Sequence, residues 1–124
     1  MGKAYGKKVW LTPDGFLQPV SNGPYKSHEA ICVVNTGDED AKLAISIYFE
    51  DREPMEGFTY KCEAKRTKHI HIELLEDDKG EKVPVGVPYA IKVESSVPVV
   101  VQVSRLDTAQ AEYTLMTSIA YPID

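Results

Sequence analysis

The sequence contains little cysteine. Cys32 and Cys62 are the only two cysteines in 124 residues, whereas a secreted domain that relied on disulfides would usually carry more. They do not form a Cys-x-x-Cys pair, which excludes that type of redox or zinc motif. We expect both to be reduced, buried thiols. A Cys32–Cys62 bridge between facing strands is the alternative.

Long apolar runs are also missing. The longest, residues 97–101, is interrupted by Pro98 and is much shorter than the roughly 18 residues of a membrane-spanning helix. The N-terminal residues contain no apolar stretch of signal-peptide length. We therefore expect a cytoplasmic protein that does not insert into membranes.

The chain also lacks an excess of positive charge, since 14 Lys and Arg face 19 Asp and Glu. The net charge of −5 disfavours nucleic acid as a partner, because an acidic chain repels phosphate backbones at long range. A basic cluster between Lys61 and Lys68 is a local exception. We interpret it as a charged strand edge that resists aggregation.

The sequence does contain a strong period-two alternation of apolar residues, which is typical of half-buried strands. It is clearest over residues 41–49, where the apolar odd positions share one face. Further strands are expected near residues 8–11, 58–64, 67–72, 89–93 and 113–120. Residues 30–34 and 97–103 are apolar on both faces, which predicts central strands covered by a second layer or by a partner subunit.

Turn signals such as Pro13-Asp14-Gly15 separate these segments. About eight short strands with close turns predict a single all-β domain over residues 1–124. We expect an antiparallel β-sandwich or jelly roll, with a closed barrel as the alternative.

Two histidines, His69 and His71, project from one face of a predicted strand at a workable spacing for metal ligands. His28 is the candidate third ligand. Because any His-x-His on a strand satisfies this pattern, we favour two surface imidazoles and predict no bound metal or other cofactor.

The run Ser27-His28-Glu29 precedes a buried strand, where rigid scaffolds often build binding sites. A serine next to a histidine in the chain does not generally form a catalytic triad, and the sequence has no Gly-x-Ser-x-Gly elbow, so we expect a protein that is not an enzyme. His28 and Glu29 offer an imidazole and a carboxylate to ligand hydroxyls. A turn at Ser27 and a salt bridge for Glu29 are the structural alternative.

Arg105 ends the most buried predicted strand, where an unpaired guanidinium is costly. Asp107 lies on the same face, and Glu29 and Asp51 are further candidate partners. Such a pair fixes a binding site or a subunit interface, or is a structural salt bridge. Some aromatic residues can stack on a sugar ring or a base, although most aromatics of a small β domain belong to the core. The candidates are Trp10, Tyr25, Tyr48, Tyr89 and Tyr121.

Several motifs follow one another along nearly the whole chain. They are Ser21-Asn22-Gly23-Pro24, Ser27-His28-Glu29, Cys32, Asn35-Thr36-Gly37-Asp38-Glu39-Asp40-Ala41, Tyr48-Phe49-Glu50-Asp51-Arg52-Glu53-Pro54, Ala64-Lys65-Arg66-Thr67-Lys68-His69, Pro98-Val99-Val100-Val101-Gln102, Arg105-Leu106-Asp107, Gln110-Ala111-Glu112 and Ile119-Ala120-Tyr121. In their ordered sum they resemble the soluble sensory rhodopsin transducer family. The family pattern has a basic residue where His71 stands, which further weakens the metal hypothesis.

The resemblance implies a β-sandwich of jelly-roll type that assembles as a homotetramer. The founding member of the family is a cytoplasmic partner of a membrane photoreceptor, and the wider family resembles carbohydrate-binding β-sandwiches. The implied function is a non-catalytic module that binds a small, carbohydrate-like ligand or transduces a signal. A signalling adaptor that acts through protein contacts is the alternative; a metal-dependent enzyme and a nucleic-acid-binding regulator are less favoured. No catalytic residue of the family carries over, and we expect a ligand pocket near Trp10, His28, Glu29, Arg105 and Asp107.

Overall fold

The computed structural model describes residues 2–124 and consists almost entirely of antiparallel strands. The elements are β1 (Lys7–Gly15), β2 (His28–Asn35), β3 (Ala41–Phe49), β4 (Met55–Cys62), β5 (Arg66–His71), the 3₁₀ turn η1 (Ile72–Leu74), β6 (Tyr89–Asp107), β7 (Thr114–Ile119) and β8 (Tyr121–Ile123). The all-β prediction of about eight antiparallel strands is confirmed. The jelly-roll detail stays a prediction. Within residues 2–124, no helix is long and apolar enough to cross a membrane.

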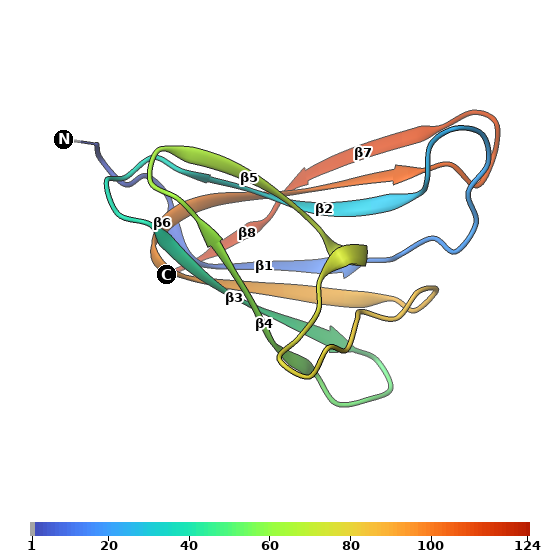
Figure 1. Ribbon diagram of the computed structural model, residues 1–124, viewed down its shortest axis with the longest axis horizontal. Coiled ribbons are helices and arrows are strands. Elements are labelled where there is room, and N and C mark those ends of the chain that lie inside the picture. Colours follow the sequence, from blue (N-terminus) through green and yellow to red (C-terminus); the bar gives the residue numbers. More distant parts are fainter. Residues whose placement is uncertain (1) are drawn as a thin grey trace.

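The longest strand, β6, has 19 residues and connects two parts of the sheet. Its first half pairs with β1 and β3, and its second half pairs with β2 and β7. We call β4-β3-β6-β1-β8 the first arm and β5-β2-β6-β7 the second arm. Figure 1 shows the two arms facing each other and converging where β6 bends, near both chain termini. One continuous strand therefore ties the arms together at that end.

The prediction of separate strands over residues 89–93 and 97–103 was wrong, because β6 runs through both. Pro98 lies between Ser95, which pairs with β3, and Val100, which pairs with β2. Proline has no N–H to donate to a ladder, so it is tolerated where a strand changes partners. The last predicted strand, residues 113–120, corresponds to β7, whereas β8 follows the buried Ala120 and was not predicted.

Apolar side chains from both arms fill the space between them. The odd positions of β3 from Ala41 to Ile47 are almost fully buried, as the alternation predicts, and they belong to one cluster with Ile31 of β2 and Ile70 of β5. Burial of a side chain of this size stabilises a fold by about 1.5–3 kcal/mol. Packing between the arms is therefore the main source of stability.

Both cysteines are free thiols, as expected. Cys62 is fully buried in the core, whereas Cys32 is half-buried because it lies on the opposite face of β2. Two valines share that face: Val34 is exposed and Val100 is half-buried. Within residues 2–124, no second layer covers this face of the second arm, which we call the outer face.

Gly6 lies just before β1, where the backbone passes close to β6 at Val99. It has a φ of +111°, and a Cβ at this position would lie 1.9 Å from the carbonyl oxygen of Val99. We expect Gly6→Ala to cost about 1–2 kcal/mol for the positive φ and about 1–3 kcal/mol more for the clash. Gly80→Ala is the matched control, because Gly80 has a φ of +80° with no atom within 4 Å of its Cβ position. Equal losses in urea unfolding would contradict this close packing.

Candidate functional site

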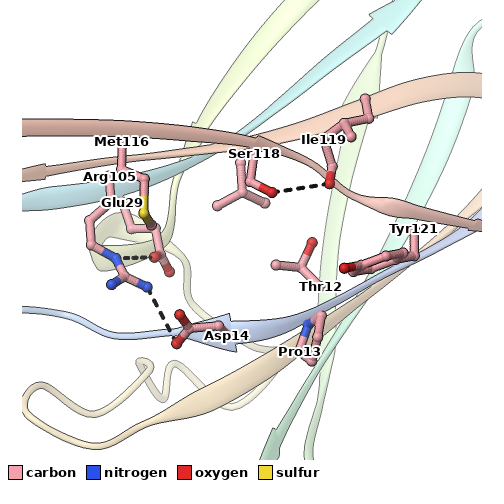
Figure 2. A pocket seen from close by; sticks show the side chains of 10 residues that line it. Thr12, Pro13, Asp14, Glu29, Arg105, Met116, Ser118, Ile119 and Tyr121 are labelled. Carbon is pink, nitrogen blue, oxygen red and sulfur yellow. Dashed lines mark hydrogen bonds and ion pairs between the residues drawn. The ribbon is translucent and has the colours of Figure 1, made fainter.

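A pocket of about 200 Å³ lies between β1, β6 and β7. It is lined by Thr12, Pro13, Asp14, Glu29, Val103, Arg105, Met116, Ser118, Ile119 and Tyr121. Figure 2 shows Glu29, Arg105 and Met116 on one side and Thr12, Pro13 and Tyr121 on the other. Residues of both arms therefore meet at this pocket.

Glu29 is the one charged residue of the described chain that is fully buried. Its Oε2 accepts a hydrogen bond from Arg105 Nε at 2.9 Å, and its Oε1 accepts one from the Tyr89 hydroxyl. Glu29 and Arg105 are direct partners in the β2–β6 ladder, whereas Tyr89 begins β6 in the first arm. The carboxylate thus joins the two arms, and loss of one partner of such a buried pair typically costs about 3–5 kcal/mol.

Burial raises the pKa of Glu29 above its ordinary value, and the hydrogen bonds from Tyr89 and Arg105 offset only part of this rise. Burial, followed by the charge of Glu29, also raises the pKa of Tyr89. The Tyr89 hydroxyl therefore keeps its proton at physiological pH and remains a donor to the carboxylate.

Arg105 has further donors in the pocket. Its Nη2 is buried and has no hydrogen-bond acceptor within residues 2–124. The Asp14 carboxylate oxygen Oδ1 is 3.7 Å from Nη2, which is beyond hydrogen-bond distance. The pocket thus contains a charged donor with unused capacity.

Gly15 makes room for the Tyr89 ring. The two residues are paired across β1 and β6, and a Cβ on Gly15 would lie 2.2 Å from Cε1 of Tyr89. The interpretation of Pro13-Asp14-Gly15 as a turn was wrong, because these residues end β1 beside a register shift after Thr12. That irregular strand end places Asp14 at the pocket.

The structure brings together two of the five residues predicted for a ligand site, Glu29 and Arg105. Trp10 lies in the core, where its Nε1 donates to the carbonyl oxygens of Lys7 at 2.9 Å and Val99 at 3.0 Å. Neither Trp10, His28 nor Asp107 lines this pocket. A role of these residues in ligand binding stays a prediction.

His28 and Asp107 each have other partners. The ring of His28 stacks on that of His71, with centroids 4.9 Å apart. Asp107 Oδ1 accepts a hydrogen bond from the Ala109 backbone N–H at 2.8 Å. Both side chains therefore have local structural contacts.

Of the two predicted histidines, His71 forms part of a small polar cluster with Glu73 and His28. His71 Nδ1 lies 2.7 Å from Glu73 Oε2, and His69 is exposed. Among residues 2–124, no three His, Cys, Asp or Glu side chains are grouped so that they could hold a metal ion.

Sequence reasoning missed Thr12, Asp14 and Ser118 at the pocket, and it did not place Tyr121 there or Tyr89 beside it. Both tyrosines were named as aromatics that can stack on a sugar ring or a base, and Tyr89 was also predicted as an inward-facing strand residue. No local pattern marks these residues, because β1, β7 and β8 meet only after the arms have closed on each other.

The fold and the pocket together place the chain in a class of proteins: small antiparallel β proteins with a charged pocket between the two arms of the sheet. A family model described as Anabaena sensory rhodopsin transducer matches residues 5–122. The chain belongs to this family, as its resemblance predicts. A comparison with curated proteins finds no match.

Solved structures agree with this assignment. "Crystal Structure of Thermotoga maritima 1070" is 39% identical, with a TM-score of 0.86 and coverage of 95% of this chain and 96% of that chain. "Anabaena sensory rhodopsin transducer" is 38% identical, with a TM-score of 0.75 and coverage of 89% and 96%. Both share the fold over nearly their whole length.

Tyr89→Phe tests the buried network. We expect it to lower the free energy of unfolding by about 1–3 kcal/mol near neutral pH, because one buried oxygen of Glu29 loses its donor. Tyr60→Phe is the matched control, since Tyr60 is exposed. Chemical denaturation of both variants measures the difference.

The loss is also expected to depend on pH. Because the pKa of Glu29 in the folded protein lies above its ordinary 4.5, the folded state binds more protons between these values, and stability falls as the pH rises. The hydrogen bond from Tyr89 lowers the pKa of Glu29. Loss of this hydrogen bond therefore extends the decrease in stability to higher pH. The cost of Tyr89→Phe should shrink as the pH drops toward 4.5; a constant cost would contradict the assignment.

Proposed function

We propose that the protein is a non-catalytic binding or sensor module for a small molecule. The observation that carries this proposal is the pocket whose wall contains the buried Glu29 and the partly unbonded Arg105. Both oxygens of Glu29 are engaged in hydrogen bonds, which favours a positioning role over acid–base chemistry. A rigid pocket with few polar groups is typical of ligand sites.

The pocket lining supports a ligand with both polar and apolar parts. Thr12 and Ser118 supply hydroxyls, and Met116 and Tyr121 supply apolar surface. A carbohydrate-like ligand, which the family resemblance implies, is one candidate. The volume of about 200 Å³ is below the roughly 300–1,000 Å³ of sites for drug-sized molecules, which favours a small metabolite.

The family supports a transducer role in the cytoplasm. A solved relative is named as a sensory rhodopsin transducer, and we propose that this chain likewise passes a signal to a protein partner. In this proposal, occupancy of the pocket alters the surface that the partner contacts.

A thermal-shift screen against sugars, nucleotides, organic acids and divalent metals tests binding. A ligand at about a hundredfold excess over its Kd adds about 2.7 kcal/mol, which shifts the Tm by several degrees. We expect Met116→Trp, which fills the pocket, to abolish the shift. Leu74→Trp is the control, because Leu74 is exposed on η1 and does not line the pocket. Equal effects of the two variants would contradict binding at this pocket.

A second candidate function is an adaptor that works through protein contacts. It is favoured by the outer face of the second arm, where Leu115, Ile119 and Val34 are 70%, 60% and 37% exposed. Exposed apolar patches of this kind mark interaction sites. We propose that this face is buried between copies of the chain in the homotetramer implied by the family.

Light scattering after size-exclusion chromatography tests the assembly. We expect a tetramer for the unmodified chain and a smaller species for Leu115→Glu, because a buried unpaired charge opposes association. Leu74→Glu is the control, since Leu74 is equally exposed, at 68%, but lies on η1. A monomeric unmodified chain, or equal loss of assembly in both variants, would contradict the proposal.

A further inference from the structure

The guanidinium of Arg105 has hydrogen-bond capacity that the chain does not use. Within residues 2–124 it makes one hydrogen bond, from Nε to Glu29 at 2.9 Å. Nη2 is buried and has no acceptor there. A buried donor without an acceptor is unfavourable, so an acceptor that reaches Nη2 gains more than one at an ordinary surface site.

Asp14 covers this donor without bonding to it. Its Oδ1 lies 3.7 Å from Nη2, and its side chain is 80% exposed. Such a solvent-screened ion pair contributes little, so its displacement costs little. A ligand's carboxylate in the same place can accept hydrogen bonds from both Nη groups, in the planar geometry that guanidinium and carboxylate groups prefer.

The charges of the pocket select the class of anion. Arg105 is the one cation among the lining residues, and Glu29 and Asp14 are acidic. A monoanion that displaces the Asp14 side chain puts one negative charge beside Arg105, as Asp14 did before. A dianion such as phosphate puts two negative charges there, next to the buried Glu29, and is therefore repelled more strongly. Met116 and Tyr121 provide apolar surface for the rest of the ligand.

Building on the proposed small-molecule function, we propose that this pocket binds a small monocarboxylate with an apolar body. The carboxylate bonds to the Nη groups of Arg105 in place of Asp14. The body packs against Met116 and Tyr121, and the Glu29–Tyr89 contact holds Arg105 in position.

The test compares isovalerate with isovaleramide, which share a branched apolar body and differ in charge. Inorganic phosphate serves as the dianion and glucose as the neutral polyol. Each is titrated into the isotope-labelled full chain near neutral pH and at constant ionic strength. Chemical shifts of the backbone amides of Asp14, Met116 and Ser118 report binding at the pocket.

We expect isovalerate to bind at least about tenfold more tightly than isovaleramide or phosphate. The reason for the difference from isovaleramide is that hydrogen bonds to a charged group are stronger than those to a neutral amide. Asp14→Asn should strengthen isovalerate binding about two- to fivefold, because a competing charge is removed. Asp78→Asn makes the same change in net charge in a separate hollow beside Gly57 and should have no effect. Arg105→Lys keeps a cation beside Glu29 but lacks the Nη pair, and should weaken binding about tenfold or more.

Several outcomes would overturn the inference. If isovaleramide or glucose shifts the same amides at the same concentration as isovalerate, the pocket binds small molecules but does not select a carboxylate. If Asp14→Asn weakens isovalerate binding, the inference that the ligand's carboxylate takes the place of Asp14 is wrong. If no probe shifts these amides, the carboxylate inference fails, and the proposed function fails with it only if the thermal-shift screen is also flat.

Discussion

The structure depends on one constraint, the continuity of β6 through both arms of the sheet. A strand of 19 residues that pairs with four others fixes the relative position of those strands. Its bend near Pro98 brings the arms face to face, so that each arm buries the apolar face of the other. Tyr89 and Arg105, near opposite ends of this strand, consequently meet at the same carboxylate.

That carboxylate combines a structural and a functional role. Glu29 is expensive to bury, and it is tolerated because Tyr89 and Arg105 satisfy both of its oxygens. The same pairing holds the Arg105 guanidinium at the pocket wall while its Nη2 stays without an acceptor. Rigid placement of an unsatisfied donor is what a binding site needs, and it explains why a costly buried charge is a reasonable feature here.

The strand β7 relates the two proposed functions. Successive residues of a strand point to opposite faces, so Met116 and Ser118 line the pocket while Leu115, which does not line it, carries exposed apolar surface on the outer face. A ligand in the pocket and a protein on the outer face would therefore contact the same edge strand, which pairs with β6 alone within the described chain. This arrangement is a short physical path between a sensor site and an interaction surface.

The sequence by itself determined the all-β class, the inward faces of β3 and β6, and the family, because alternation and ordered motifs are local properties of a chain. It also singled out Glu29 and Arg105, because one enters and the other ends a buried strand, where a charged residue demands a partner. Only the tertiary structure decided which partners they have. Asp14, Tyr89 and β7 reach the pocket through the bend of β6 and a strand irregularity at residues 13–15. Both arise from packing between distant segments, which sequence spacing does not encode.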